Sequence, residues 1–315
     1  MSEGFRAALS WFASDNAIRY GLPLVVVFLL LGGPRQLLLS LRSWFRSSQG
    51  LAQHSPSSTG GVLAGVLEAT IGQLIRPSLL LIAATEPRFS KLGGDPELPA
   101  DMGWPAGLER PRTFLAQIDL GELPRDKIDW LPREGRIYAF HDPDGSDAPD
   151  AVSVIFGTAP PRPPLSPPVG AKRLAERRVT FWPCTCAPSL DWLGLDASEL
   201  ALSDEEFRRL SAMDDAPPPD EIQHRIGGYP NEIQPERMWL SCEHAARGLP
   251  DPAWGSEIPP AIARAAKTWR LLLQIDSDPG LKMNFGDGGR FYVFIRERHA
   301  RAADFSKTVS LWQTY

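Results

Sequence analysis

Short apolar runs, separated by prolines, glycines and polar loops, follow one another along most of the chain and predict a sheet-rich domain. Six runs have the length and composition of strands, at residues 113–119, 135–140, 151–156, 270–276, 289–294 and 308–313. The run SLLLIA at 78–83 predicts one more strand. Residues 62–75 have apolar side chains at helical spacing and predict a helix that packs on the domain.

The strand-like runs belong to a motif series that occurs twice. KLGGDPELP from Lys91 and RIGGYPNEIQ from Arg225 share a Gly-Gly-x-Pro turn, and each leads to a run that ends in Gln-Ile-Asp. GRIYAF or GRFYVF follows, and then a closing apolar run. Four elements in the same order predict an internal duplication, with repeat one at about 91–156 and repeat two at about 225–313. The predicted fold class is α+β, with two duplicated three-stranded β units.

Strand periodicity assigns side chains to faces in the second element of each repeat. Alternation predicts one apolar face per repeat, made by Phe114, Ala116 and Ile118 in the first and by Leu271, Leu273 and Ile275 in the second. The opposite face then carries Gln117 and Asp119, and Gln274 and Asp276. The Asp-Gly-Gly at 287–289 predicts a hairpin turn.

The first residues differ in character from the rest of the chain. Residues 1–46 form a hydrophobic segment, and fifteen uncharged residues lie between Arg19 and Arg35 with aromatic residues on both sides. We expect residues 20–43 to form a helical membrane anchor, although Pro23 also permits a buried or amphipathic hairpin. More basic residues follow the run than precede it, which predicts a single-pass protein of the bacterial inner membrane with its main domain in the cytoplasm.

Composition and spacing divide the remainder of the chain. Residues 47–61 are rich in Ser and Gly and predict a flexible tether, with the main domain at 62–315. Residues 159–220 form a Pro-rich insert between the repeats, and its segments PPRPPLSPP (160–168) and APPP (216–219) are expected to act as surface connectors.

Net charge and cysteine content narrow the class of function. The net charge is −5, from 33 basic and 38 acidic residues without long runs, so the sequence has no basic footprint for nucleic acid. Three cysteines are too few for a disulfide framework, which favours a reducing compartment. No nucleotide-binding, serine hydrolase or zinc protease motif is present in the sequence.

The combined motifs resemble those of the bacterial YwqG-like family. They are KLGGDPELP, TFLAQIDLGELP, GGYPNEIQ, LLLQIDSD, FGDGGRFYVFI and DFSK, and they extend over roughly residues 76–315. The resemblance implies a mixed, sheet-rich α+β domain of bacterial origin without an established activity. The first sixty residues and the Pro-rich insert are outside these motifs.

Several polar positions are candidates for a ligand site. If the repeats pack about a two-fold axis, Asp119 and Asp276 would approach each other and share a proton or a cation. The alternative is that each Gln caps backbone groups and each Asp starts a turn. The candidate ligand-binding residues are Gly93, Gly94, Gln117, Asp119, Gly227, Gly228, Tyr229, Gln274, Asp276 and Asp287.

Metal binding and acid–base catalysis give two further hypotheses. Cys184, Cys186, Cys242 and His244 together have the composition of a closed zinc site, although their spacing is tighter than usual. His224, which precedes the second Gly-Gly turn, is a candidate base; His141 ends the GRIYAF strand and lacks a counterpart in the second repeat.

These observations predict a non-enzymatic binding or scaffold domain that holds a protein partner or a small ligand in a cleft between its repeats. One alternative is a hydrolytic or metal-assisted enzyme that uses the Asp119/Asp276 region with His224. Another is an immunity-type protein that binds a toxin.

Overall fold

The structure is a computed structural model, which describes residues 56–315 except 191, 194, 196–201, 214, 218–220, 235–236 and 254–255. The predicted hydrophobic segment at 1–46, with its stretch 20–43, lies outside the described residues. In the part of the chain that the structure does describe, no helix combines the length and apolar character that a membrane crossing needs. This finding contradicts the expected single-pass inner-membrane protein. The longest helix has 19 residues, but it contains Glu68 and Gln73.

The chain divides into two compact units, of which the smaller contains residues up to Leu74 and Pro188–Met213. Helix α4 (Pro56–Leu74) confirms the helix predicted at 62–75, and it begins within the range predicted as a tether. Helix α6 (Asp204–Ser211) starts at a capping box in which Ser203 and Glu206 satisfy each other's backbone N–H groups. Glu68 of α4 and Arg209 of α6 form an ion pair of 3.2 Å.

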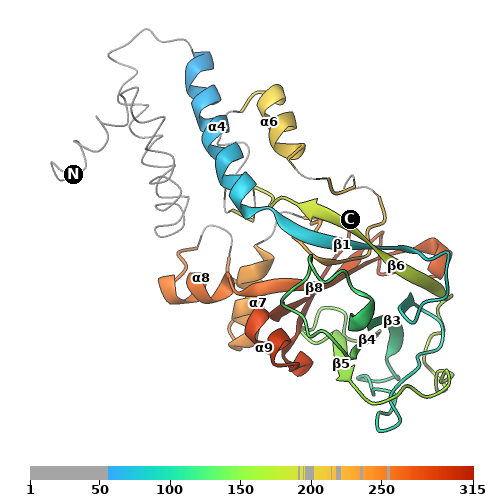
Figure 1. The fold of residues 1–315 in the computed structure, drawn as a ribbon. Coiled ribbons are helices and arrows are strands. Elements are labelled where there is room, and N and C mark those ends of the chain that lie inside the picture. The colour runs from blue at the N-terminus through green and yellow to red at the C-terminus, as the bar shows by residue number, and fades with distance from the viewer. Residues whose placement is uncertain are drawn as a thin grey trace. The chain divides into compact units, whose positions relative to one another are not determined.

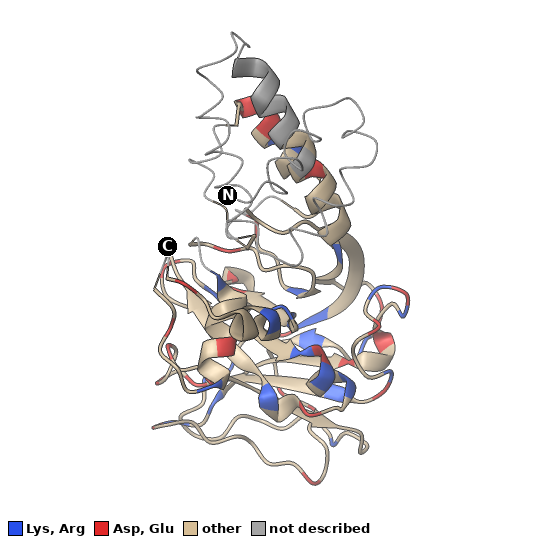
Figure 2. Ribbon diagram, turned by 90° about the vertical axis from the view of Figure 1, so that its left-hand side faces the viewer, with Lys and Arg blue, Asp and Glu red and all other residues tan. Residues whose placement is uncertain are grey.

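The larger unit, residues 75–187 and 214–315, is built on a 10-stranded antiparallel sheet (Figure 1). Its strands are β1 (Arg76–Ala83), β2 (Lys91–Leu92), β3 (Thr113–Asp119), β4 (Arg136–His141), β5 (Val152–Gly157), β6 (Arg177–Cys186), β7 (Arg225–Gly227), β8 (Trp269–Asp276), β9 (Arg290–Arg296) and β10 (Val309–Gln313). The predicted α+β class is confirmed. Lysine and arginine are interspersed with aspartate and glutamate along the ribbon (Figure 2).

The strand order is β10-β9-β8-β7-β1-β6-β2-β3-β4-β5, so β1 and β6 lie at its centre. Four strands extend from each of them, and we call β1-β7-β8-β9-β10 and β6-β2-β3-β4-β5 the two half-sheets. The outermost strands approach each other, because the Val152 N–H donates to the Ser310 hydroxyl over 3.0 Å. The sheet is therefore nearly closed.

Strand β6 lies within the Pro-rich insert, at residues where the sequence analysis predicted no strand. Its ladder with β1 runs from Arg76 opposite Cys186 to Ala83 opposite Val179. Pro183 has no N–H to donate to a ladder, so the sequence of this run argued against a central strand.

A bulge in each half-sheet changes the predicted faces. The register between β3 and β4 shifts between Phe114 and Ala116, and the register between β8 and β9 shifts between Leu271 and Leu273. Phe114 therefore joins a second cluster, with Tyr138 and Phe140, on the other face of the sheet from Ala116 and Ile118. The extra residues of the two bulges, Leu115 and Leu272, lie in the main core instead.

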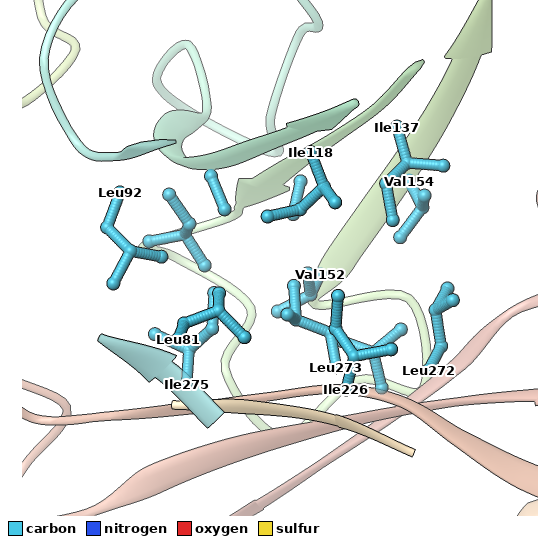
Figure 3. Close-up of a cluster of buried hydrophobic side chains, with 14 of the residues drawn as sticks. Leu81, Leu92, Ile118, Ile137, Val152, Val154, Ile226, Leu272, Leu273 and Ile275 are labelled. Atoms are coloured by element: carbon cyan, nitrogen blue, oxygen red, sulfur yellow. The ribbon is translucent and has the colours of Figure 1, made fainter. Parts of the chain in front are cut away.

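The main core lies between the half-sheets. Leu92, Ile118 and Ile137 of one half-sheet point toward Leu273 and Ile275 of the other (Figure 3). Loops cover the outer face of β3 and β4, where Leu98 and the partly buried Trp104 pack on Phe114 and Phe140. Burial on both faces accounts for the nearly continuous apolar runs of these strands.

Three helices and three short 3-10 turns complete the larger unit. The helices are α7 (Met238–Ala246), α8 (Pro260–Ala266) and α9 (Glu297–Arg301), and the turns are η1 (Leu120–Glu122), η2 (Pro279–Leu281) and η3 (Phe305–Lys307). Buried Glu243 fixes α7 to the sheet, since its carboxylate accepts a 3.0 Å hydrogen bond from the Trp269 indole and pairs with Arg247 and Arg296.

Candidate binding site at the junction of the half-sheets

The two Gln-Ile-Asp glutamines are buried and hold backbone segments. The Gln117 side-chain oxygen accepts from the Glu97 N–H at 2.9 Å, and its NH2 group donates to the Phe89 carbonyl at 2.8 Å. In the same way, the Gln274 side-chain oxygen accepts from the Asn231 N–H at 2.9 Å, and its NH2 group donates to the Gln223 carbonyl at 3.0 Å. Asn231 and Gln223 lie on opposite sides of the second Gly-Gly turn. Each glutamine thus closes the loop that carries the turn, which is the capping role considered as the alternative.

Asp119 begins the turn after β3. Its carboxylate accepts from the Gly121 N–H at 2.8 Å and forms an ion pair of 3.2 Å with Arg136 on the next strand. This arrangement caps η1 and ties the ends of two neighbouring strands together.

Asp276 is buried and has a similar local role. Its carboxylate accepts from the Gln223 N–H at 2.8 Å and from the Gln274 side chain at 3.0 Å, and Arg290 lies at 3.5 Å. The contacts of Asp276 and those of Asp119 therefore lie within separate half-sheets, and the structure shows no contact that joins the two carboxylates.

His224 has both ring nitrogens engaged. Its Nδ1 accepts from the Asp276 N–H at 3.2 Å, so the proton of the neutral ring is on Nε2, which donates to Asp278 at 3.3 Å. The hydrogen bond from His224, assisted by the ion pair with Arg177, holds the pKa of Asp278 well below its usual range. This histidine therefore links β7 to the loop after β8.

The predicted turn glycines have backbone conformations that suit only glycine. Gly93 and Gly94 have φ of 60° and 75°, and Gly227 and Gly228 have φ of 74° and 71°. A Cβ on Gly93 would lie 2.1 Å from the Ala175 carbonyl oxygen. The turns therefore bring the backbone close to the central strands.

Asp287 lies away from these turns. It belongs to the turn before β9, where its carbonyl accepts from the Tyr315 N–H at 3.1 Å. The flanking Gly286 and Gly288 have φ of 84° and 62°, which agrees with the predicted hairpin turn.

The predicted zinc ligands are on separate elements. Cys184 and Cys186 are on β6, whereas Cys242 and His244 are on α7, where the His244 Nδ1–H donates to the Pro250 carbonyl at 2.7 Å. Among the described residues, no group of three or more histidine, cysteine, aspartate or glutamate side chains could hold a metal ion. The structure thus does not assemble the Cys3His set.

A cavity of about 170 Å³ lies where the second Gly-Gly turn meets the start of β1. We call it the junction cavity. Its wall is formed by Gly227 and Gly228 with Leu271 of β8, and a loop of the other half-sheet contributes Trp130. The charged residues that line it are Arg76, Lys127, Asp129, Arg270 and Glu297.

Positive charge is in excess at the junction cavity. Arg270 is matched by Glu297 at 2.9 Å, whereas the Arg76 guanidinium lies over the Tyr229 ring, 4.4 Å from its centroid. Arg76 forms no ion pair with any other described residue. Burial lowers the pKa of Arg76 despite the opposing effect of Tyr229, but a guanidinium stays charged at physiological pH.

Sequence reasoning identified only part of this site. Gly227 and Gly228 were predicted and line the cavity, and Tyr229 lies beneath Arg76. Arg76, Arg270 and the loop with Lys127 were missed, because they come from strands and loops far apart in the sequence. Their only sequence signal is the position of Arg76 directly before the strand SLLLIA.

Fold and site together define a sheet-rich α+β domain with a small, positively charged cavity at the junction of its half-sheets. Residues 90–314 match the family described as domain of unknown function (DUF1963), and the chain belongs to that family. No curated protein matches the chain.

Proposed function

We propose that this domain is a binding module whose site is the junction cavity, and that its ligand is a small molecule with a carboxylate or phosphate group. The observation that carries the proposal is Arg76, a partly buried cation at the cavity that has no carboxylate of the described residues within ion-pair distance. A buried charge is costly unless it is paired, and a planar guanidinium binds carboxylates and phosphates in a bidentate manner.

The contacts favour binding over the enzymatic alternative. That alternative depended on Asp119, Asp276 and His224, and each of these side chains is engaged in hydrogen bonds that hold its own loop or strand. The cavity itself brings together arginines, glycines and a tryptophan, without a nucleophile and base in contact among its lining residues.

The motif series supports a proposal on the architecture as well. We propose that β1–β5 and β6–β10 are two copies of one five-stranded unit. Each copy adds one strand, β1 or β6, to the strands that lie within the repeat boundaries predicted from sequence. The strand order supports this, because each copy's second strand pairs with the first strand of the other copy. On the same motifs we propose that the chain is a YwqG-like member of its family.

The binding proposal is tested by thermal unfolding in the presence of single probes, which are inorganic phosphate, acetate and glutamate. A ligand that binds only the folded protein raises its melting temperature, so at least one probe should stabilise the wild type. Arg76→Gln should abolish that increase, and Arg264→Gln, on the exposed face of α8, should retain it. An increase that survives in Arg76→Gln would refute the assignment of the cavity, and no increase with any probe would refute anion binding.

A further inference from the structure

A second cation, Arg225 on β7, is buried next to a cysteine pair. Its side chain is 3% exposed, and its Nη1 lies 2.9 Å from the Cys186 sulfur and 3.4 Å from the Tyr229 carbonyl oxygen. No carboxylate of the described residues forms an ion pair with Arg225. Since a guanidinium stays protonated and a buried charge requires compensation, the one acidic group in contact with it is the Cys186 thiol.

The other half-sheet has a buried cation at the equivalent position, and carboxylates are its partners. Lys91 on β2 occupies the corresponding place before the first Gly-Gly turn, and it is fully buried. Its ammonium group lies 2.9 Å from Glu176 and 3.4 Å from Glu97. Two carboxylates neutralise Lys91, whereas Arg225 has a sulfur atom in contact instead. The comparison indicates that Cys186 provides the negative charge as a thiolate.

Cys184 completes the site. It lies two residues before Cys186 on β6, so both side chains project from the same face of the strand. The Cys184 thiol donates a hydrogen bond to the Cys186 sulfur, which lowers the pKa of Cys186 to about 6, with a further contribution from Arg225. The same hydrogen bond, together with burial, raises the pKa of Cys184. Cys184 and Arg225 thus both favour the thiolate form of Cys186, whereas Cys184 favours its own thiol form.

A small reagent has a short route to this sulfur. Gly228 forms part of the wall of the junction cavity, and a Cβ added to it would lie 2.9 Å from the Cys186 sulfur. Gly228 therefore contacts both the cavity and the Cys186 sulfur.

We propose that Cys186 and Cys184 form a peroxide-reactive thiol pair. The Cys186 thiolate attacks one oxygen of a small hydroperoxide, the O–O bond breaks, and the products are a Cys186 sulfenic acid and the hydroxide or alkoxide of the leaving group. The Cys184 sulfur then attacks the sulfenic sulfur, a disulfide forms, and the Cys184 proton leaves with the hydroxyl group as water. Arg225 stabilises the thiolate before the first step.

The disulfide would be strained and easily reduced. Two residues of an extended strand place their Cα atoms about 6.6 Å apart, near the upper limit of disulfide geometry. Closure thus requires local puckering of β6 beside Gly228. A strained disulfide has a high reduction potential, so mild thiol reductants should restore the pair.

The first test measures the thiolate directly. The ultraviolet thiolate absorption of the full-length protein at neutral pH should show one thiolate per chain, and Cys186→Ser should lose it. Cys242→Ser is the matched control, because it removes another buried cysteine, on α7, and should retain the signal. Arg225→Met should lose the thiolate and Arg225→Lys should keep it. A wild-type protein without a thiolate would overturn the proposal even if the arginine variants fail to fold.

The second test follows the reaction. The folded protein is treated with hydrogen peroxide, sulfenic acid is trapped with dimedone, and peptides are mapped by mass spectrometry. In the wild type we expect a Cys184–Cys186 disulfide that forms before Cys242 is modified. Cys184→Ser should accumulate trapped sulfenic acid at Cys186, and Cys186→Ser should give neither product. First modification at Cys184 or Cys242, or reaction only after unfolding, would overturn the proposal.

Discussion

Burial of His141 should make the domain lose stability in mild acid, and the size of this effect follows from its surroundings. His141, the last residue of β4, is 8% exposed, and its ring centroid lies 4.6 Å from that of Phe291 and 5.7 Å from that of Phe285. Burial lowers the pKa of His141 from 6.5 to about 4, although the charge of Asp142 opposes this shift.

The sign of the effect is set by which state binds the proton first. The unfolded chain protonates His141 near its ordinary pKa, whereas the folded protein resists protonation until the pH approaches 4. The stability that the folded protein gains from keeping His141 neutral is therefore fully present above pH 6.5, and it is lost as the pH falls from there to about 4. One pKa unit corresponds to about 1.4 kcal/mol, so the loss amounts to about 3 kcal/mol.

The assay compares three proteins by denaturant unfolding at neutral pH and at about pH 4. His141→Phe keeps an aromatic ring against Phe291 but cannot be protonated, so it should lose about 3 kcal/mol less than the wild type over this range. Ser146→Ala removes the hydroxyl that lies 3.1 Å from the His141 Nε2 and should keep the wild-type pH dependence. Parallel curves for wild type and His141→Phe, or an NMR titration of His141 near its ordinary pKa, would refute the reasoning.

Three further substitutions, one of them paired with a control at Gly65, test contacts that hold the fold. Glu243→Gln removes the charge that pairs with two arginines while it leaves an oxygen for Trp269, and it should lower the free energy of unfolding by about 3 kcal/mol; an unchanged denaturation midpoint would contradict this. Gly227→Ala, at φ 74° and 3.1 Å from a backbone oxygen, should destabilise by about 1–2 kcal/mol, whereas Gly65→Ala, in open space on α4, should stabilise by about 0.5–1 kcal/mol; equal effects would argue against the positive φ as cause. Gln274→Leu leaves a buried N–H and a buried carbonyl unpaired and should accelerate hydrogen exchange in the loop after Gly228; unaltered exchange there would exclude the bridging role.

Local patterns sufficed to predict most of the strands. The runs at 113–119 and 270–276 became β3 and β8, and the turns predicted from Gly-Gly pairs have the positive φ that only glycine adopts readily. The prediction of faces from period-two alternation failed at the bulges. An inserted residue such as Leu115 places the side chains that precede it on the opposite face of the sheet. A bulge has no sequence signature in an all-apolar run.

Long-range pairing was the part that sequence could not supply. Strand β6 was hidden by Pro183 and by the prolines around it, and without β6 the partner of β1 was unknown. The ladder from Ser78 to Gly227 joins residues 149 positions apart, and no local pattern predicts such a pair. The cavity residues contributed by β1 and β8 were missed for the same reason.

The pairing of β2 with β6 and of β7 with β1 also accounts for the different surroundings of the two Gly-Gly turns. The first Gly-Gly turn packs on the chain just before β6, where Glu176 fills the space: a Cβ on Gly94 would lie 2.3 Å from its carboxylate oxygen, and this carboxylate neutralises Lys91. The second Gly-Gly turn packs on the start of β1, where the uncharged Ser78 and the Cys186 sulfur would each lie 2.9 Å from a Cβ added to Gly228. No carboxylate of the described residues therefore takes the place of Glu176 at the second turn, where Arg76 lies at the cavity and Arg225 contacts the Cys186 sulfur. Two turns that share the Gly-Gly-x-Pro motif thus have different chemistry, because β6 completes the first and β1 completes the second.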